Sequence, residues 1–142
     1  MKAIHHILRN KSSEIYSVTP DVSVFDSLTV MMDKNISALL IMQGGILCGI
    51  FSERDYARKI ILQGKASKET RIGEVMTKDL ITISLADSVD HCMQLMTNNY
   101  IRHLPVIDNG KVLGLISIGD LVKSVIEEQK QTIEQLQSYI NS

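Results

Sequence analysis

The chain matches itself when it is shifted by 65 residues, and the match runs without a gap. Between the identical positions of the two hairpins hydrophobic character is also kept, as where Ile41 falls on Val106, Ile50 on Leu115 and Phe51 on Ile116. The identities in register include Val24/Val89, Met31/Met96, Ile36/Ile101, Leu39/Leu104, Gly45/Gly110, Gly49/Gly114, Ser52/Ser117, Asp55/Asp120 and Ile61/Ile126. An internal duplication constrains the architecture before any local assignment, because both copies must be built alike and bury their apolar faces together. The sequence therefore predicts two copies of one structural unit.

Each copy is predicted to run strand, helix, strand, strand, helix. Ser23 and Ser88 are suitable N-caps for the first helix, which should end near Lys34 or Asn99 and carries apolar residues at helical spacing. The turn pairs Gly44-Gly45 and Asn109-Gly110 tolerate the positive φ of a tight hairpin. The predicted segments are extended pieces at Tyr16–Thr19 and Leu80–Ser84, strands at Ala38–Met42, Ile46–Phe51, His103–Ile107 and Lys111–Ile116, and closing helices at Arg54–Leu62 and from Gly119 onward.

This order predicts an α+β fold in which two tandem β-α-β-β-α repeats pack sheet to sheet in one module. We expect an N-terminal segment with the first repeat over 1–62, a linker over 63–79, the second repeat over 80–128 and a helical tail over 129–142. Within the linker, Gln63–Thr70 is polar, and Ile72–Met76 reads as a helical turn leading into the second copy. The tail continues the last helix with one apolar stripe at Ile133, Leu136 and Ile140.

Composition narrows the class of protein. Apolar residues make up 44% of the chain, aromatic residues 4% and Trp none, so we expect an aliphatic core and no disorder. The formal net charge of −1 does not point to nucleic acid or an anionic membrane. The two cysteines, Cys48 and Cys92, lie in apolar patterns and read as buried thiols, and the N-terminus lacks the apolar run of a signal peptide. A cytoplasmic protein without a metal site is expected.

The sharpest local motif ends each hairpin as Gly, two hydrophobic residues, Ser, two further residues and Asp. It occurs over residues 49–55 and 114–120. Together with the fold order, the duplication and the strand Leu104–Asp108, this motif resembles the CBS domain pair, or Bateman module, named after cystathionine β-synthase. The resemblance covers about Ser13 to Glu128, and residues 51–59 are especially similar to small bacterial and plant-organelle members that consist of the pair alone.

The resemblance implies a ligand containing adenosine: AMP, ADP, ATP, S-adenosylmethionine or NAD(H). It assigns the ribose hydroxyls to Asp55 and Asp120, with Ser52 and Ser117 beside them. This role suits a carboxylate, which only accepts hydrogen bonds, since the two hydroxyls are donors. The remaining contacts implied by the resemblance come from Ser17, Thr19, Pro20, Ser37 and Ala38 in the first copy and from Thr82, Ser84, Ile101, Pro105 and Ile116 in the second.

Basic residues near the motif are candidates for phosphate. Arg54 and Arg58 fall in the first turns of the closing helix and could bind phosphate bidentately, whereas the second copy is expected to have Gly119 and Val122 at those places. The clefts are therefore expected to differ, with NAD(H) preferred at the first and AMP at the second. Arg102 and His103 match positions where some members bind phosphate, and the first copy has Ser37-Ala38 there.

Structural interpretations stand beside these. Ser-x-x-Asp at a strand-to-helix junction is similar to a capping box, and both roles can coexist. Arg54, Arg58 and Lys59 could form a solvated helix face, and the Arg102-His103 pair could be a solvated edge. The leading hypothesis is a regulatory nucleotide sensor acting on an unidentified partner, and the alternative is a structural or oligomerisation module with degenerate clefts. No activated nucleophile or paired acid and base is visible, so an enzyme is not expected. The apolar line of the final helix predicts a homodimer.

Overall fold

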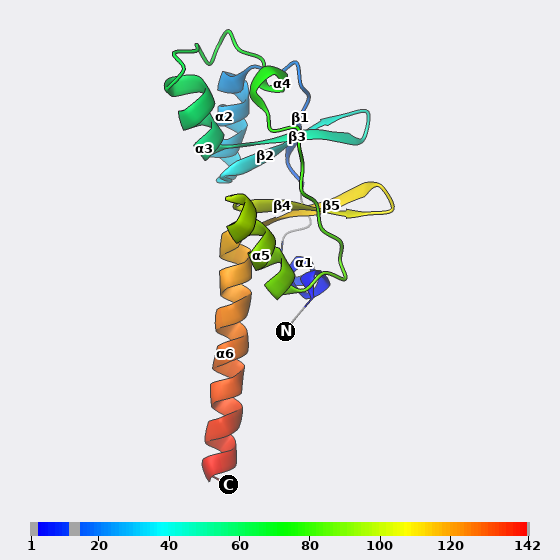
Figure 1. The fold of residues 1–142 in the computed structure, drawn as a ribbon, viewed down its shortest axis with the longest axis vertical. Helices are drawn as coiled ribbons and strands as arrows, with labels where there is room; N and C mark the ends of the chain where they lie inside the picture. The colour runs from blue at the N-terminus through cyan, green and yellow to red at the C-terminus, as the bar shows by residue number, and fades with distance from the viewer. Residues whose placement is uncertain (1–2, 12–14, 142) are drawn as a thin grey trace. The chain divides into compact units, whose positions relative to one another are not determined.

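The computed structural model describes residues 3–11 and 15–141, and the chain has an α+β fold (Figure 1). It divides into two compact units. One unit holds the first repeat and runs from Ile15 to Ile81; the other joins the N-terminal residues up to 14 to the second repeat and the tail, from Thr82 onward. The duplication predicted from the sequence is thus present as two units of similar construction.

The first-repeat unit contains a three-stranded sheet in the order β1-β2-β3, with β1 parallel and β3 antiparallel to β2. Phe51, Leu39 and Ile41 of this sheet are fully buried in the unit's aliphatic core. The elements are β1 (Ser17–Val18), α2 (Val24–Lys34), β2 (Ala38–Gln43), β3 (Ile46–Ser52), α3 (Glu53–Asp55), η1 (Tyr56–Ile61) and α4 (Ile72–Val75).

Local chemistry sets the ends of these elements where the sequence predicted them. The Ser23 hydroxyl accepts a hydrogen bond of 3.0 Å from the Asp26 amide and begins α2. Asn35, in the left-handed region at φ 53°, ends it. Gly44 and Gly45 both have positive φ, so the two-residue turn matches the twist of the hairpin.

The predicted helix Arg54–Leu62 differs in its winding. It begins at Glu53 as a short α-helical turn and continues as the π-helical segment η1. The Leu62 amide donates to the carbonyl of Ala57, five residues back, at 3.1 Å. Such wide turns are rare, and the spacing of apolar residues over nine positions does not distinguish a π-helix from an α-helix.

The second-repeat unit contains a two-stranded antiparallel sheet, β4-β5. The predicted extended piece Leu80–Ser84 contributes a single parallel bridge, from Ile83 to Val106, in the place that β1 takes in the first unit. The Ser88 hydroxyl caps α5 by accepting from the His91 amide at 3.1 Å. The elements are α1 (Ile4–Asn10), α5 (Val89–Asn99), β4 (His103–Asp108), β5 (Lys111–Ser117) and α6 (Ile118–Asn141).

The segment that precedes each repeat packs in the unit of the other repeat. The Ile4 amide of α1 donates to Asp87 at 2.9 Å, and the Ile72 amide of α4 donates to Val22 at 2.8 Å. Val22 and Asp87 are related by the 65-residue shift, and both isoleucines are fully buried. The helical turn predicted at 72–76 therefore exists, but it completes the core of the first repeat.

The stretch predicted as a polar linker is also part of the first unit. The Ser67 and Thr70 carbonyls accept hydrogen bonds from the first amides of α2, at 3.0 Å and 2.8 Å. Thr70 is buried, and its hydroxyl donates to Ala66 at 2.8 Å. Polar composition indicated a connection here, whereas the backbone hydrogen bonds tie it to the helix start.

Candidate functional site: the two serine-aspartate turns

The first motif forms a closed turn where β3 meets α3. The Ser52 amide and hydroxyl donate to Oδ2 of Asp55 at 2.9 Å and 3.0 Å, and the Asp55 amide donates to Ser52 Oγ at 3.2 Å. This is a reciprocal capping box with Asp in the place of the usual Glu or Gln. The capping interpretation is therefore correct for this turn, and the carboxylate still has further acceptor positions.

The second motif repeats this geometry where β5 meets α6. The Ser117 amide donates to Oδ2 of Asp120 at 2.8 Å, and the Asp120 amide donates to Ser117 Oγ at 3.2 Å. Both motif aspartates are partly buried, with side-chain exposures of 20% for Asp55 and 25% for Asp120. Each turn thus presents a half-buried carboxylate at the start of a helix.

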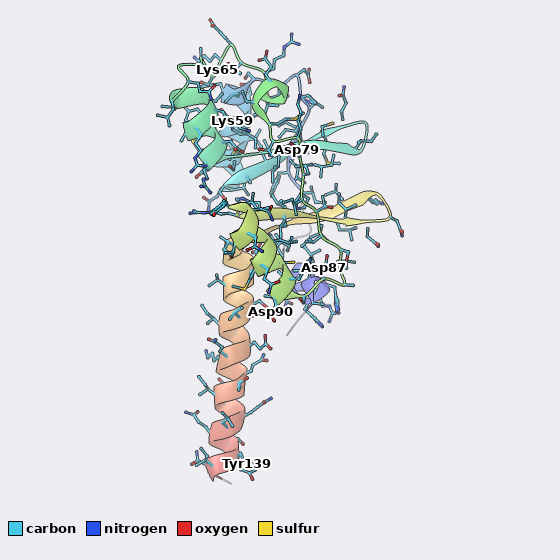
Figure 2. All side chains as sticks on the ribbon, viewed as in Figure 1. Lys59, Lys65, Asp79, Asp87, Asp90 and Tyr139 are labelled. Carbon is cyan, nitrogen blue, oxygen red and sulfur yellow. The ribbon has the colours of Figure 1, made fainter. Side chains whose placement is uncertain are left out.

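A lysine accompanies the first carboxylate from one turn along the same helix. Figure 2 labels Lys59 in the first-repeat unit. Its Nζ lies 3.8 Å from Oδ1 of Asp55 and donates to the Val75 carbonyl at 2.8 Å and the Thr77 hydroxyl at 3.2 Å. The ammonium therefore joins the motif turn to the end of α4 and to Thr77 just beyond it.

A lysine accompanies the second carboxylate from a distant part of the chain. Lys11, directly after α1, places Nζ 2.6 Å from Oδ2 of Asp120 and 2.6 Å from the Leu115 carbonyl. Burial acts to raise the pKa of Asp120, but hydrogen bonds from Lys11 and Ser117 outweigh it, so the pKa lies below its usual value of 3.8. Asp120 is therefore held as a carboxylate at neutral pH.

The sequence assigned neither lysine to the site, since Lys59 was interpreted only as part of a solvated helix face and Lys11 was not singled out. The 65-residue shift brings Lys59 onto Ser124 and Lys11 onto Met76, so neither has a lysine counterpart. The spacing of Asp55 and Lys59, four residues apart on a helix, was a usable signal. Nothing in the sequence pairs Lys11 with Asp120, because the contact depends on how α1 folds.

The segment before the hairpin lies beside the motif in each unit. The Glu53 amide donates to the Ser37 carbonyl at 3.0 Å, and the Ile118 amide donates to the Arg102 carbonyl at 2.9 Å. In register, Ala38 pairs with Ser52, and His103 pairs with Ser117. The predicted grouping of these residues around the two turns is thus present within each unit.

The other residues assigned to adenine are arranged less simply. Thr82 and Ser84 flank Ile83, whose amide donates to Pro105 at 3.0 Å, so they lie beside β4. Three further predicted residues, Ala38, Pro105 and Ile116, are buried. Their side chains belong to the core, and their backbone is the part that remains for a ligand.

Hollows next to the turns have different linings. In the second-repeat unit, a cavity of about 240 Å³ lies between α1 and α6 and is lined by His6, Ile7, Asn10, Lys11, Asp120, Lys123, Ser124 and Glu127. In the first-repeat unit, Ser37 and Glu53 line one hollow of about 400 Å³. Thr19 and Pro20 line a separate, more open one of about 620 Å³. The first-repeat unit on its own therefore does not bring Thr19 and Pro20 into the hollow of Ser37; Ser17 lies in β1, paired with Leu40 of β2.

The charge difference between the turns is smaller than the sequence analysis expected. Arg54 and Arg58 are exposed on α3 and η1, and Gly119 replaces Arg54 in the second repeat. The 65-residue shift, however, brings Arg58 onto Lys123 of α6, which lines the cavity beside Asp120. The second turn therefore keeps a basic residue at one of these two positions and gains Lys11.

Other chemistry is limited in the described ranges 3–11 and 15–141. They contain no group of three His, Cys, Asp or Glu side chains placed to hold a metal ion. None of their helices combines the length and apolarity that crossing a membrane requires. Cys92 is buried and Cys48 half-buried, and both are free thiols. Burial, together with nearby Asp87, raises the pKa of Cys92 to about 11, so this thiol is unreactive at neutral pH.

Comparison with known proteins agrees with this geometry. The sequence is 43% identical over 127 residues to the mitochondrial CBS domain-containing protein CBSX3 of Arabidopsis thaliana, covering 86% of this chain and 62% of that protein. A solved CBS-domain protein from Burkholderia ambifaria is 48% identical, with a TM-score of 0.87 over 90% of this chain and 96% of the other.

A more distant solved structure is the CBS domain pair of protein MJ0100, in complex with 5′-methylthioadenosine and S-adenosylmethionine. It is 25% identical, with a TM-score of 0.79 over 90% of this chain and 98% of the other. The family model for the CBS domain matches residues 6–62 and 72–127, which is most of the chain and one match for each repeat. The chain therefore belongs to the CBS domain family and carries a tandem pair of CBS domains.

Proposed function

We propose that this protein is a regulatory module that binds adenine nucleotides at its two Ser-x-x-Asp turns and reports their level to a partner protein. The observation that carries the proposal is the pair of equivalent turns, each with a half-buried carboxylate at the start of a helix. The MJ0100 pair, whose complex contains two adenosine derivatives, supports the ligand class.

The chemistry of the turns fits a ribose. Two adjacent hydroxyls are hydrogen-bond donors, and a carboxylate has about four acceptor positions, of which the capping bonds use only some. The ammonium of Lys11 favours the ionised form of Asp120, and the ammonium of Lys59 lies 3.8 Å from the Asp55 carboxylate. Ser52 and Ser117 hold the carboxylates in place, so capping and ribose binding are compatible roles.

Ligand choice follows the remaining charge difference. Arg54 is the basic residue at the first turn that has no counterpart at the second, where Gly119 stands. We assign a ligand with more than one phosphate, NAD or NADH in preference to ATP, to the first turn, and AMP to the second. A ligand-bound crystal structure with the same mononucleotide at both turns would contradict this assignment.

The proposal also covers the class of protein, its cellular location and its oligomeric state. We infer a binding protein and not an enzyme, because the described side chains near the turns are carboxylates paired with lysines and include no activated nucleophile. The free thiols Cys48 and Cys92 support a reducing, cytoplasmic location. The exposed apolar residues of α6 support a homodimer.

Thermal unfolding in the presence of AMP, ADP, ATP, NAD, NADH or S-adenosylmethionine tests the function. A ligand that binds only the folded state raises the melting temperature, and at 100 times its Kd it adds about 2.7 kcal/mol to stability. We expect one or two of these nucleotides to shift the transition and the others to leave it unchanged. Assay of the same mixtures for nucleotide turnover provides the control: release of a product would contradict the binding-protein assignment.

A structural module is the second candidate, and one observation favours it. Even without a bound ligand, Asp55 and Asp120 each have a serine as capping partner and a lysine within ion-pair distance. In that case both turns serve only to begin the helices α3 and α6, and none of the six nucleotides shifts the melting transition.

A further inference from the structure

Helix α6 presents an apolar row that faces away from the unit to which the helix belongs. Its buried contacts come from Leu121 and Ser124, with Val125 and Glu128 half-buried. These residues lie on the side that contacts α5, β5 and α1. The residues exposed on the other side include Val122, Ile126, Gln129, Ile133, Leu136 and Ile140, and every residue from Gln129 to Asn141 is exposed. Figure 1 shows the helix continuing well beyond the strands of its unit.

The exposed row has the spacing of a coiled-coil seam. Its six positions are separated by four, three, four, three and four residues, which is an unbroken heptad repeat. Ile126, Ile133 and Ile140 take the a positions; Val122, Gln129 and Leu136 take the d positions. The seam spans about 28 Å at the helical rise of about 1.5 Å per residue.

The isoleucines at the a positions point to two parallel strands, because a β-branched residue at a with leucine at d favours a parallel dimer. Leu136 completes this pattern at one d position, and the other two d residues are Val122 and Gln129. We propose that α6 pairs with α6 of a second copy as a parallel, in-register two-stranded coiled coil over Val122–Ile140. This inference rests on the proposed homodimer, and it is independent of nucleotide binding.

Gln129 distinguishes parallel from antiparallel pairing. In a parallel, in-register dimer each d residue faces its own copy, so the two Gln129 amides face each other and can exchange a hydrogen bond. In an antiparallel dimer a d residue faces an a residue, and every a residue of this seam is isoleucine. The buried amide would then lack a partner, which is unfavourable.

The charges beside the seam favour the same arrangement. Lys123 and Lys130 take e positions, whereas the g positions are Val125, Thr132 and Tyr139, none of them acidic. Antiparallel pairing places e residues opposite e residues and brings the lysines of the two copies onto one side. Parallel pairing places each e residue opposite a g residue, so no like-charged pair forms across the seam.

Single cysteines at the ends of the seam test the orientation in the full chain. With diamide as oxidant, Ile140→Cys and Val122→Cys should each form a disulfide-linked dimer, because identical residues face each other in a parallel seam. Ser138→Cys, at the outward f position of the same turn, should not, and the wild-type chain with its native thiols is the background. A mixture of the two variants that links Cys at 122 to Cys at 140 in preference to the self-linked dimers would overturn the parallel arrangement.

Light scattering of the unlinked proteins separates the orientation from the assembly. The wild-type chain should have about twice the monomer mass of 15.9 kDa, and Leu136→Asp should lower it to the monomer mass, while Gln135→Asp at an outward position should not. A monomeric or trimeric wild type contradicts the two-stranded pair itself. Thermal shifts by nucleotides read the proposed function separately, and they should be the same in wild type and Leu136→Asp.

Discussion

The two motif turns share one geometry and differ in how a positive charge reaches it. At Asp55 the ammonium comes from Lys59, four residues along the same helical segment. At Asp120 it comes from Lys11, which lies 109 residues away in sequence, just after α1. Since a partly buried carboxylate needs compensation for lost hydration, both turns meet the same physical requirement by different covalent routes.

We infer from this difference that the duplication has preserved the positive charge beside each motif aspartate more closely than the residues that supply it. The first turn is self-contained, because motif and lysine belong to one stretch of chain. The second turn depends on the N-terminal segment, which must fold onto the second repeat before Asp120 has its lysine. Matched substitutions in the two repeats should therefore have equal effects on stability where the contacts are alike and different effects where the contacts differ.

The largest effect is expected where the two repeats are equivalent. Ile4 of α1 and Ile72 of α4 are the fully buried isoleucines in the helices that precede the two repeats. Ile4→Ala or Ile72→Ala should each lower the free energy of unfolding by about 2–5 kcal/mol. Urea denaturation measures this, with Ile46→Ala at a 68% exposed residue as the matched control. If Ile4→Ala behaved like that control, α1 would not complete the core of the second-repeat unit.

A smaller and unequal effect is expected at the motif glycines. A Cβ on Gly49 would lie 2.6 Å from Met76 Sδ and 2.9 Å from the Thr77 carbonyl oxygen, whereas one on Gly114 would lie 2.9 Å from Leu8 Cδ2. A backbone oxygen cannot yield as a leucine methyl group can. Gly49→Ala should therefore destabilise by about 1–3 kcal/mol, and Gly114→Ala by less. Equal urea midpoints for the two variants would show that the residues after α4 leave as little room at Gly49 as α1 leaves at Gly114.

The smallest effect concerns the pH dependence of the second turn. The pKa of Asp120 is lowered in the folded state, so its contribution to stability is present above the ordinary value of 3.8 and is lost as the pH falls through the folded value. Lys11→Met removes the main group that lowers this pKa, while burial continues to raise it. The pKa of Asp120 should rise, with a loss of about 0.2–1 kcal/mol at neutral pH for this solvent-accessible, partly buried pair.

Carboxyl chemical shifts followed by NMR during an acid titration measure that pKa directly. Lys123→Met is the matched control, because Lys123 also lines the cavity beside Asp120, whereas the hydrogen bonds to the Asp120 carboxylate come from Lys11 and Ser117. An unchanged Asp120 pKa in Lys11→Met would show that Lys11 does not stabilise the Asp120 carboxylate.

Much of the fold could be predicted because its signals are local. The caps at Ser23 and Ser88, the two hairpin turns and the strand pairs follow from residue types within a few positions, and the repeat confirms each assignment twice. The exchange of α1 and α4 between the units could not, since backbone contacts such as Ile4 to Asp87 leave no periodicity in the chain. The same holds for Lys11 at Asp120, whereas Lys59 lay within reach of the helical i, i+4 rule.

Isothermal titration calorimetry of nucleotide binding to the wild-type chain, Asp55→Ala and Asp120→Ala decides whether the two motif aspartates bind ligand. A hydrogen bond to a charged group contributes about 1.5–3 kcal/mol, so Asp120→Ala should weaken AMP binding about tenfold or more, and Asp55→Ala should do the same for NAD or NADH. Asp90→Ala, an exposed aspartate on α5, should bind like the wild type. Unchanged affinities in folded Asp55→Ala and Asp120→Ala would contradict the account and leave both carboxylates as helix caps alone.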